Sequence, residues 1–222
     1  MARFTGNDEK VRGAMFIFGL FLLSIALYQN IILKLPYFYA LFSVGMFLLL
    51  LSLYNTLSAE TLFKNWDIKS VLLFGFALLA VCVVIDRIGM FLGYWEYPHY
   101  TGRDQLRKYI FEWAIALLYH QVSLLLGFEL FRRLKFSNTL SFFFAVIVVV
   151  TPVGFITEAL NLQVYSWRVL KMPFTDFRIG DYFIVFQTIG YWTMAIIPYG
   201  LYIIFDTTVK KDRSSRKQPL PF

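Results

Sequence analysis

Six runs of about 20 mostly apolar residues dominate this chain and constrain its fold more than any other feature. A helix needs about 20 apolar residues to cross the hydrocarbon core of a bilayer. The runs cover roughly residues 13–33, 37–57, 70–93, 107–131, 139–161 and 181–206. They predict an all-α fold, a polytopic transmembrane bundle of about six helices. The single membrane domain spans 13–207, between a polar tail (1–12) and a basic, disordered tail (208–222).

The composition supports this class and narrows the partners. The chain is 59% hydrophobic and 16% charged, which leaves little polar sequence for a soluble domain. Its net charge of +7 follows topology, because thirteen of the 21 lysines and arginines fall in the two tails and in the loops 55–69 and 132–138. Cytoplasmic segments carry such an excess. We expect a multi-pass protein of a bacterial-type plasma membrane, with both termini cytoplasmic and no nucleic-acid partner.

The metal-binding side chains are sparse. Cys82 is the only cysteine, so an intrachain disulfide and a multi-thiolate metal site are excluded. The histidines, His99 and His120, are too few for a histidine cluster. The sequence therefore predicts no metal site and no cofactor.

Three carboxyl side chains, Asp86, Glu112 and Glu158, lie inside predicted helices within about two turns of the outer membrane face. A buried acid costs free energy unless it is paired or used. If the helices bundle, the three groups meet in one apolar cavity, where neighbouring carboxylates keep at least one of them protonated. A protonated acid in a dry pocket is a general acid.

The second half of the chain repeats a spacing of the first. Trp95 follows Asp86 by nine residues, and Trp167 follows Glu158 by nine. This repeat predicts two related helical hairpins of the same orientation. They cover about 70–131 and 139–206. A degenerate third copy is expected in the first two helices, with Gln29 and Asn30 at the place of the acid.

Aromatic and amide side chains at the level of the acids are candidates for the walls of a cavity. Aromatic residues make up 20% of the chain, and ring faces stabilise cations. The candidate substrate-binding residues are Trp95, Tyr97, Tyr119, Asn161, Tyr165, Trp167, Gln187 and Tyr191. An acid surrounded by aromatic rings is what carbocation chemistry on an isoprenoid chain requires.

These features also have structural interpretations. An acid near a helix end can pair with an arginine, and interfacial aromatic residues commonly form a belt. The arginines in question are Arg87, Arg107 and Arg168. Asn161 and Gln187 serve equally well as helix–helix contacts. Glu129, beside Arg132 and Arg133, is interpreted as an interfacial ion pair.

The stretch from Asp86 to Glu129 resembles the membrane-integral lycopene cyclase domain of bacterial heterodimeric and fungal fused carotenoid cyclases. The shared features are an Asp near a helix end, a Gly-x-Trp-x-aromatic corner seven residues later, and two further acids. Here these are Asp86, Gly93-Tyr94-Trp95-Glu96-Tyr97, Glu112 and Glu129. The segment from Glu158 to Trp167 is a weaker second copy. Ile110-Phe111-Glu112-Trp113 lacks the proline and one acid of the family's Pro-x-Glu-Glu motif.

The resemblance implies proton-initiated cyclisation of an acyclic polyene end, an isomerase-type reaction without net redox change. Glu112 or Asp86 would protonate a terminal double bond, with Glu158 as partner base or as the neighbouring charge. The cation site would be lined by Trp95, Trp167 and Tyr119. The expected partners are membrane lipid and a hydrophobic isoprenoid, with homo- or hetero-oligomerisation left open. Two alternatives remain: a small proton-coupled carrier that uses the same acids, and a non-catalytic structural membrane protein.

Overall fold

The computed structural model of the chain describes residues 6–57, 66–100, 102, 114–171, 177–180, 182–183 and 190–216. Two predicted site residues, Glu112 and Gln187, lie outside these ranges, as does the predicted helix start at 107–113. Within the described residues the fold is an all-α bundle of six helices, which confirms the fold class expected from the apolar runs.

The helix boundaries follow the apolar runs of the sequence. In chain order they are α1 (Gly6–Leu27) with the π-helical η1 (Tyr28–Ile32), α2 (Tyr39–Leu57), α3 (Ile68–Phe91), α5 (Ala114–Arg133), the rod of α6 (Asn138–Ala145), η3 (Val146–Val150) and α7 (Thr151–Asn161), and α8 (Tyr191–Arg216). Four segments in the described ranges are long and apolar enough to cross a membrane, while the other two predicted runs, 107–131 and 181–206, each include residues outside those ranges. The four segments are Glu9–Ile32, Tyr39–Thr56, Ile68–Phe91 and Asn138–Asn161.

Both boundaries of the last predicted helix are wrong. Residues 182–183 form a strand, and α8 begins at Tyr191 instead of 181. The strand exists because Gly180, at φ +60°, turns the chain back into a short hairpin. At the other end α8 continues to Arg216, so the part of the predicted disordered tail up to that residue is helical.

The rod contains a widened turn just before Thr151 and Pro152. Proline has no N–H to donate, which removes one rung of the helical hydrogen-bond ladder. The five residues before Thr151 adopt the π-helical η3, and the Thr151 hydroxyl donates to the Val146 carbonyl at 3.0 Å. The rod from α6 to α7 thus remains one continuous element.

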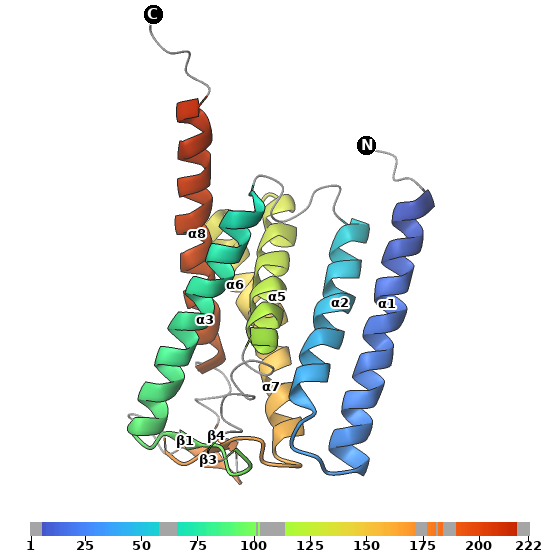
Figure 1. Cartoon of the computed structure of the whole chain (residues 1–222), viewed down its shortest axis with the longest axis vertical. Helices are drawn as coiled ribbons and strands as arrows, with labels where there is room; N and C mark the ends of the chain where they lie inside the picture. Colours follow the sequence, from blue (N-terminus) through green and yellow to red (C-terminus); the bar gives the residue numbers. More distant parts are fainter. Residues whose placement is uncertain are drawn as a thin grey trace, which may run out of the picture.

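The bundle has two distinct ends (Figure 1). α1 begins and α8 ends at one end, which we call the terminal end. The last turns of α3 and α7 and the short strands lie at the opposite end, which we call the strand end. α3 and α7 therefore run in the same direction, and the segments that follow them meet.

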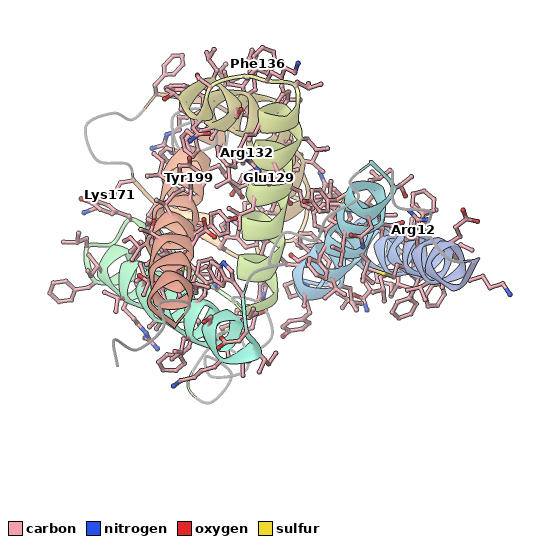
Figure 2. All side chains as sticks on the ribbon, turned by 90° about the horizontal axis from the view of Figure 1, so that it is seen from above. Arg12, Glu129, Arg132, Phe136, Lys171 and Tyr199 are labelled. Atoms are coloured by element: carbon pink, nitrogen blue, oxygen red, sulfur yellow. The ribbon has the colours of Figure 1, made fainter. Side chains whose placement is uncertain are left out.

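The helices pack around α5. α1 packs on α2, α2 on α5, and α5 on α3, α6, η3 and α8. Figure 2 shows α1 and α2 as a pair standing to one side of the other helices. The main core lies between α5, the α6–η3 rod and the first turns of α8. Its buried members are Leu124, Phe128, Ala145, Val146, Val150, Phe183, Tyr191 and Ala195.

Four two-residue strands, which the sequence did not predict, complete the strand end. β1 (Trp95–Glu96) pairs antiparallel with β2 (Arg168–Val169), with Trp95 opposite Val169 and Glu96 opposite Arg168. β3 (Arg178–Ile179) pairs with β4 (Tyr182–Phe183). The β1–β2 ladder joins the segment after α3 to the segment after α7.

Candidate functional site

Glu158 lies in the last turns of α7, with only 3% of its surface exposed. Its carboxyl oxygen Oε1 accepts a hydrogen bond from Trp167 Nε1 and another from the Tyr191 hydroxyl, each at 3.0 Å. Trp167 belongs to the loop after α7, whereas Tyr191 is the first residue of α8. Both donors use the same oxygen, so neither of these bonds involves Oε2.

A tight chain reversal brings Trp167 back to the acid. α7 ends at Asn161, and Tyr165 adopts a left-handed conformation with φ +53°. The Asn161 side chain then holds the backbone of Trp167 at two points: Nδ2 donates to the Trp167 carbonyl at 2.9 Å, and Oδ1 accepts from the Trp167 amide at 3.1 Å. An asparagine amide suits this task because it both donates and accepts.

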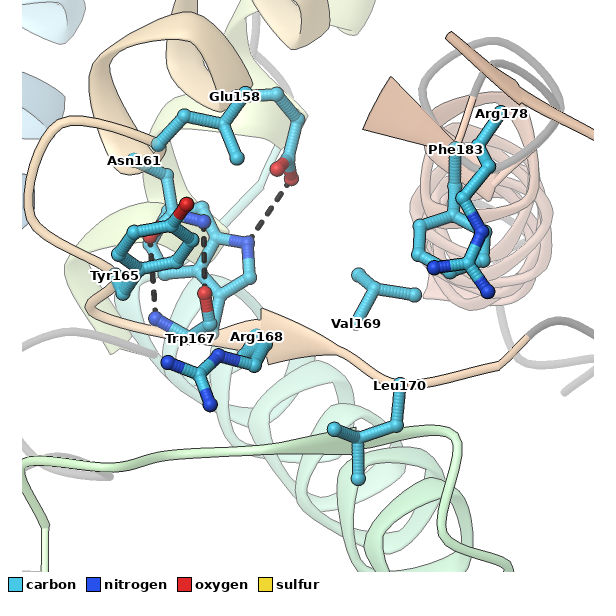
Figure 3. Close-up of a pocket in the computed structure, with 10 residues that line it drawn as sticks. Glu158, Asn161, Tyr165, Trp167, Arg168, Val169, Leu170, Arg178 and Phe183 are labelled. Atoms are coloured by element: carbon cyan, nitrogen blue, oxygen red, sulfur yellow. Dashed lines mark hydrogen bonds between the residues drawn. The ribbon is translucent and has the colours of Figure 1, made fainter. Parts of the chain in front are cut away.

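A cavity of about 420 Å³ adjoins this corner. Its walls combine the carboxyl group, aromatic rings, aliphatic side chains and two arginines. The lining residues are Glu158, Asn161, Leu162, Tyr165, Trp167, Arg168, Val169, Leu170, Arg178 and Phe183. Figure 3 shows Glu158 and Trp167 on one side of the cavity and the β3–β4 pair of Arg178 and Phe183 across from them. The volume is within the range of small-molecule sites.

Asp86, near the end of α3, has a closely similar environment. It is 1% exposed. Its oxygen Oδ1 accepts from Trp95 Nε1 at 3.0 Å and from the Tyr97 hydroxyl. As at Glu158, one indole N–H and one phenol O–H bind a single carboxyl oxygen. Each of the two acids therefore has a matching pair of donors.

The two corners are related residue by residue. Each Trp follows its acid by nine positions, and 72 positions separate the Glu96–Arg168 pair. The same interval separates Asp86 from Glu158. It also separates Gly93, at φ +67°, from Tyr165, at φ +53°. Glu96 and Arg168 hold equivalent places and face each other in an antiparallel ladder. Such a self-paired position marks a local two-fold axis between the corners.

One position distinguishes the corners. Gly89 and Asn161 both lie three residues after their acid. The edge of the Trp95 ring occupies the space above Gly89, where a Cβ atom would come within 2.0 Å of the ring carbons. In the other corner Asn161 fills the equivalent place and binds the Trp167 backbone instead. The Trp95 ring is therefore packed onto its own helix.

The predicted site residues divide into two groups in the structure. Glu158, Asn161, Tyr165 and Trp167 line the cavity, and Tyr191 binds Glu158 without being among the described lining residues. The residues of the separate Asp86 cluster are Asp86, Trp95 and Tyr97. These three are not among the described residues that line this cavity, and Glu112, the third acid of the expected shared site, lies outside the described ranges. Tyr119 lies on α5, but its side chain is outside the described set.

Several lining residues were not predicted from the sequence. They are Leu162, Arg168, Val169, Leu170, Arg178 and Phe183. Arg168 follows Trp167 directly, so the repeat itself, with Glu96 after Trp95, could have pointed to it. Phe183 offered no such signal, since its strand lies within an apolar run that predicted a helix.

The predicted ion pair of Glu129 is confirmed at the terminal end of α5. The Arg132 guanidinium donates through Nη2 to Glu129 Oε2 at 2.7 Å and through Nε to Oε1 at 3.1 Å. This bidentate geometry is the usual arrangement of arginine with a carboxylate. Glu129 is thereby accounted for without a role at the cavity, which lies at the opposite end of the bundle.

Comparison of the chain with protein-family models, with curated proteins and with solved structures finds no match. The fold and the composition nevertheless define a class. The chain is a helical membrane protein with several membrane-spanning helices, and it carries a buried acid beside a partly aromatic cavity at one end of the bundle.

Proposed function

We propose that the protein is a membrane-embedded cyclase in which Glu158 protonates a carbon–carbon double bond of an isoprenoid chain. The observation that carries this proposal is the pair of hydrogen bonds to Oε1 of a buried acid that lines a cavity. The resemblance of the Asp86–Glu129 stretch to the membrane-integral cyclase domain supports the same reaction class.

The two hydrogen bonds to Oε1 orient the Glu158 carboxyl group as a proton donor. A protonated carboxyl group has one oxygen that only accepts and one that donates its O–H. Trp167 and Tyr191 both donate to Oε1, so that oxygen acts as the acceptor and the proton belongs on Oε2. Burial in apolar surroundings favours the neutral acid.

The proposed reaction balances with Glu158 alone. The O–H bond at Oε2 breaks as a new C–H bond forms at a terminal double bond, leaving a tertiary carbocation. The electron pair of a second double bond attacks this cation and closes a ring through a new C–C bond. Loss of a neighbouring proton to the Glu158 carboxylate restores a double bond and the acid. The product is an isomer of the substrate, and the ring of Trp167, next to Glu158, stabilises the intermediate cations.

Glu158 thus takes the role that the sequence suggested for Glu112 or Asp86. Asp86 accepts hydrogen bonds from Trp95 and Tyr97 in the loop after α3, and none of the three is among the described residues lining the cavity. We propose that Asp86 stabilises the β1–β2 junction and takes no part in proton transfer.

We further propose that the terminal end faces the cytoplasm of a bacterial-type cell, because the tails and the loops at that end carry most of the positive charge. The cavity would then open near the outer leaflet, where a lipid-soluble substrate can enter from the membrane.

Co-expression with an acyclic polyene tests the function. Cells that make the polyene and this protein are expected to accumulate products with cyclic ends. Glu158→Gln should reduce their formation by about 10²- to 10⁴-fold, the usual contribution of a general acid. Asp86→Asn is the matched control and should retain activity within a few-fold. An unchanged polyene beside folded wild-type protein would contradict the proposal.

A further inference from the structure

Arg178 enters the cavity without a carboxylate partner among the described residues. Its guanidinium carbon lies 4.5 Å from the centre of the Phe183 ring. Phe183 is 5% exposed and belongs to the main core, so the ring that supports the arginine is fixed. A cation held over an aromatic face in this way is pre-organised for a ligand.

Arg168 lines the same cavity from β2. Its guanidinium lies 5.2 Å from the Tyr165 ring centre and 3.4 Å from Glu96 Oε1. The side chains of this ion pair are 51% and 45% exposed, and exposed pairs contribute only about 0–1 kcal/mol. Arg168 can therefore exchange Glu96 for a more strongly charged acceptor at little cost.

From these contacts we infer that the cavity binds an isoprenoid whose far end carries a phosphate or diphosphate group. Arg168 and Arg178 bind the anionic group, and the unsaturated chain reaches Glu158. The inference rests on the proposed function, since it takes Glu158 as the acid that meets the double bond. Guanidinium groups match phosphate oxygens in bidentate geometry, whereas a pure hydrocarbon would leave Arg178 without an anionic partner among the described residues of the wall.

Calorimetric titration of the purified protein in detergent tests this directly. Geranylgeranyl phosphate is expected to bind at least about tenfold more tightly than geranylgeraniol, which has the same chain and no charge. Arg178→Gln should remove that preference. Lys171→Gln is the control, because Lys171 lies over the Tyr94 ring at the strand end and is not among the lining residues. It should leave both affinities unchanged.

A second variant should shift affinity in the opposite direction. Glu96→Gln removes the carboxylate that competes for Arg168, so geranylgeranyl phosphate should bind several-fold more tightly, while geranylgeraniol binds as before. An increase in one variant and a decrease in another cannot both arise from damage to the fold. Equal affinity for the phosphate and the alcohol in the wild-type protein would overturn the inference.

Two further ligands separate the sources of phosphate. Inorganic phosphate and phosphatidylglycerol micelles should each compete at least about tenfold more weakly than geranylgeranyl phosphate; competition of equal strength by either would overturn the isoprenoid assignment. The binding assay needs no turnover, so the expected preference for geranylgeranyl phosphate can be measured whether or not cyclisation occurs. Failure of this inference can therefore be distinguished from failure of the proposed cyclisation.

Discussion

The two acid corners of this protein share one design and differ in what surrounds it. In each, a helix ends shortly after a buried acid, a residue with positive φ reverses the chain, and a tryptophan returns to donate its indole N–H to the acid. The Asp86 corner takes its second donor, Tyr97, from the same loop. The Glu158 corner takes Tyr191 from a different helix, α8.

This difference suggests how a repeated structural unit can acquire a site. The Trp95 ring packs on Gly89 of the helix that precedes it, and the two donors described at Asp86, Trp95 and Tyr97, follow it within eleven residues. Around Glu158 the tryptophan is held through its backbone by Asn161, and the cavity lies beside it. We infer that the Asp86 corner is structural and that its partner carries the chemistry.

Filling the space above Gly89 should have the largest effect on stability. Gly89→Ala puts a methyl group where the Trp95 ring lies, which displaces the ring and removes a donor from a buried acid. We expect a loss of about 3 kcal/mol from overpacking and the lost hydrogen bond, measured by unfolding in detergent. Gly75→Ala on the same helix has no atom within 4 Å of the new Cβ and should be neutral or slightly stabilising. Equal results for both variants would contradict the tight packing of Trp95.

Removing the two hydrogen bonds from the Asn161 side chain to the Trp167 backbone should reduce stability somewhat less. Asn161→Ala deletes both bonds to the Trp167 backbone, and we expect a loss of about 2 kcal/mol together with reduced cyclisation, because Trp167 is no longer fixed against Glu158. The exposed Asn138, at the start of α6, provides the control. If Asn138→Ala and Asn161→Ala lost the same amount of stability, the Asn161 side chain would not position Trp167.

Loss of one phenol donor distinguishes the corners by activity. Tyr97→Phe and Tyr191→Phe each remove a hydroxyl bound to a buried acid, and each should cost about 1–2 kcal/mol of stability. Only Tyr191→Phe should also lower the cyclisation rate, since it frees Oε1 to compete for the proton. A rate loss in the Tyr97 variant as large as in the Tyr191 variant would show that both acids take part.

The smallest effect on stability is expected from the Glu96–Arg168 ion pair, which joins the two corners. Because both side chains are about half exposed, Glu96→Gln should destabilise the protein by less than about 1 kcal/mol. The difference should vanish at high salt, where exposed charges are screened. A larger, salt-independent loss in thermal unfolding would mean that the ladder depends on this pair.

The sequence predicts the bundle and the acids better than it predicts the cavity. Apolar runs locate helices because membrane spans need them, and the spacing of nine residues located both tryptophans. Arg178 and Phe183 escaped prediction because a two-residue strand leaves no periodic signal, and its place depends on the turn at Gly180.

The third copy of the acid corner, expected in the first two helices, shows a related limit of prediction from the sequence. Aligned on the residue with positive φ, Lys34 corresponds to Gly93 and Tyr165. Leu27 then stands at the place of the acids, and Asn30 stands at the place of Asn161. Asn30 donates to the Leu160 carbonyl at 2.9 Å and so packs η1 against α7. In this alignment Gln29 and Asn30, which were expected at the place of the acid, lie two and three positions beyond it.

The most direct test of the central claim follows the proton itself. Membranes containing the protein are supplied with the acyclic polyene in D₂O, and the products are analysed by mass spectrometry. We expect wild type and Asp86→Asn to place one deuterium in each new ring, and Glu158→Gln to form almost no labelled ring. Deuterated rings from the Glu158→Gln protein at the wild-type rate, or their loss only in the Asp86→Asn protein, would contradict the assignment of the acid.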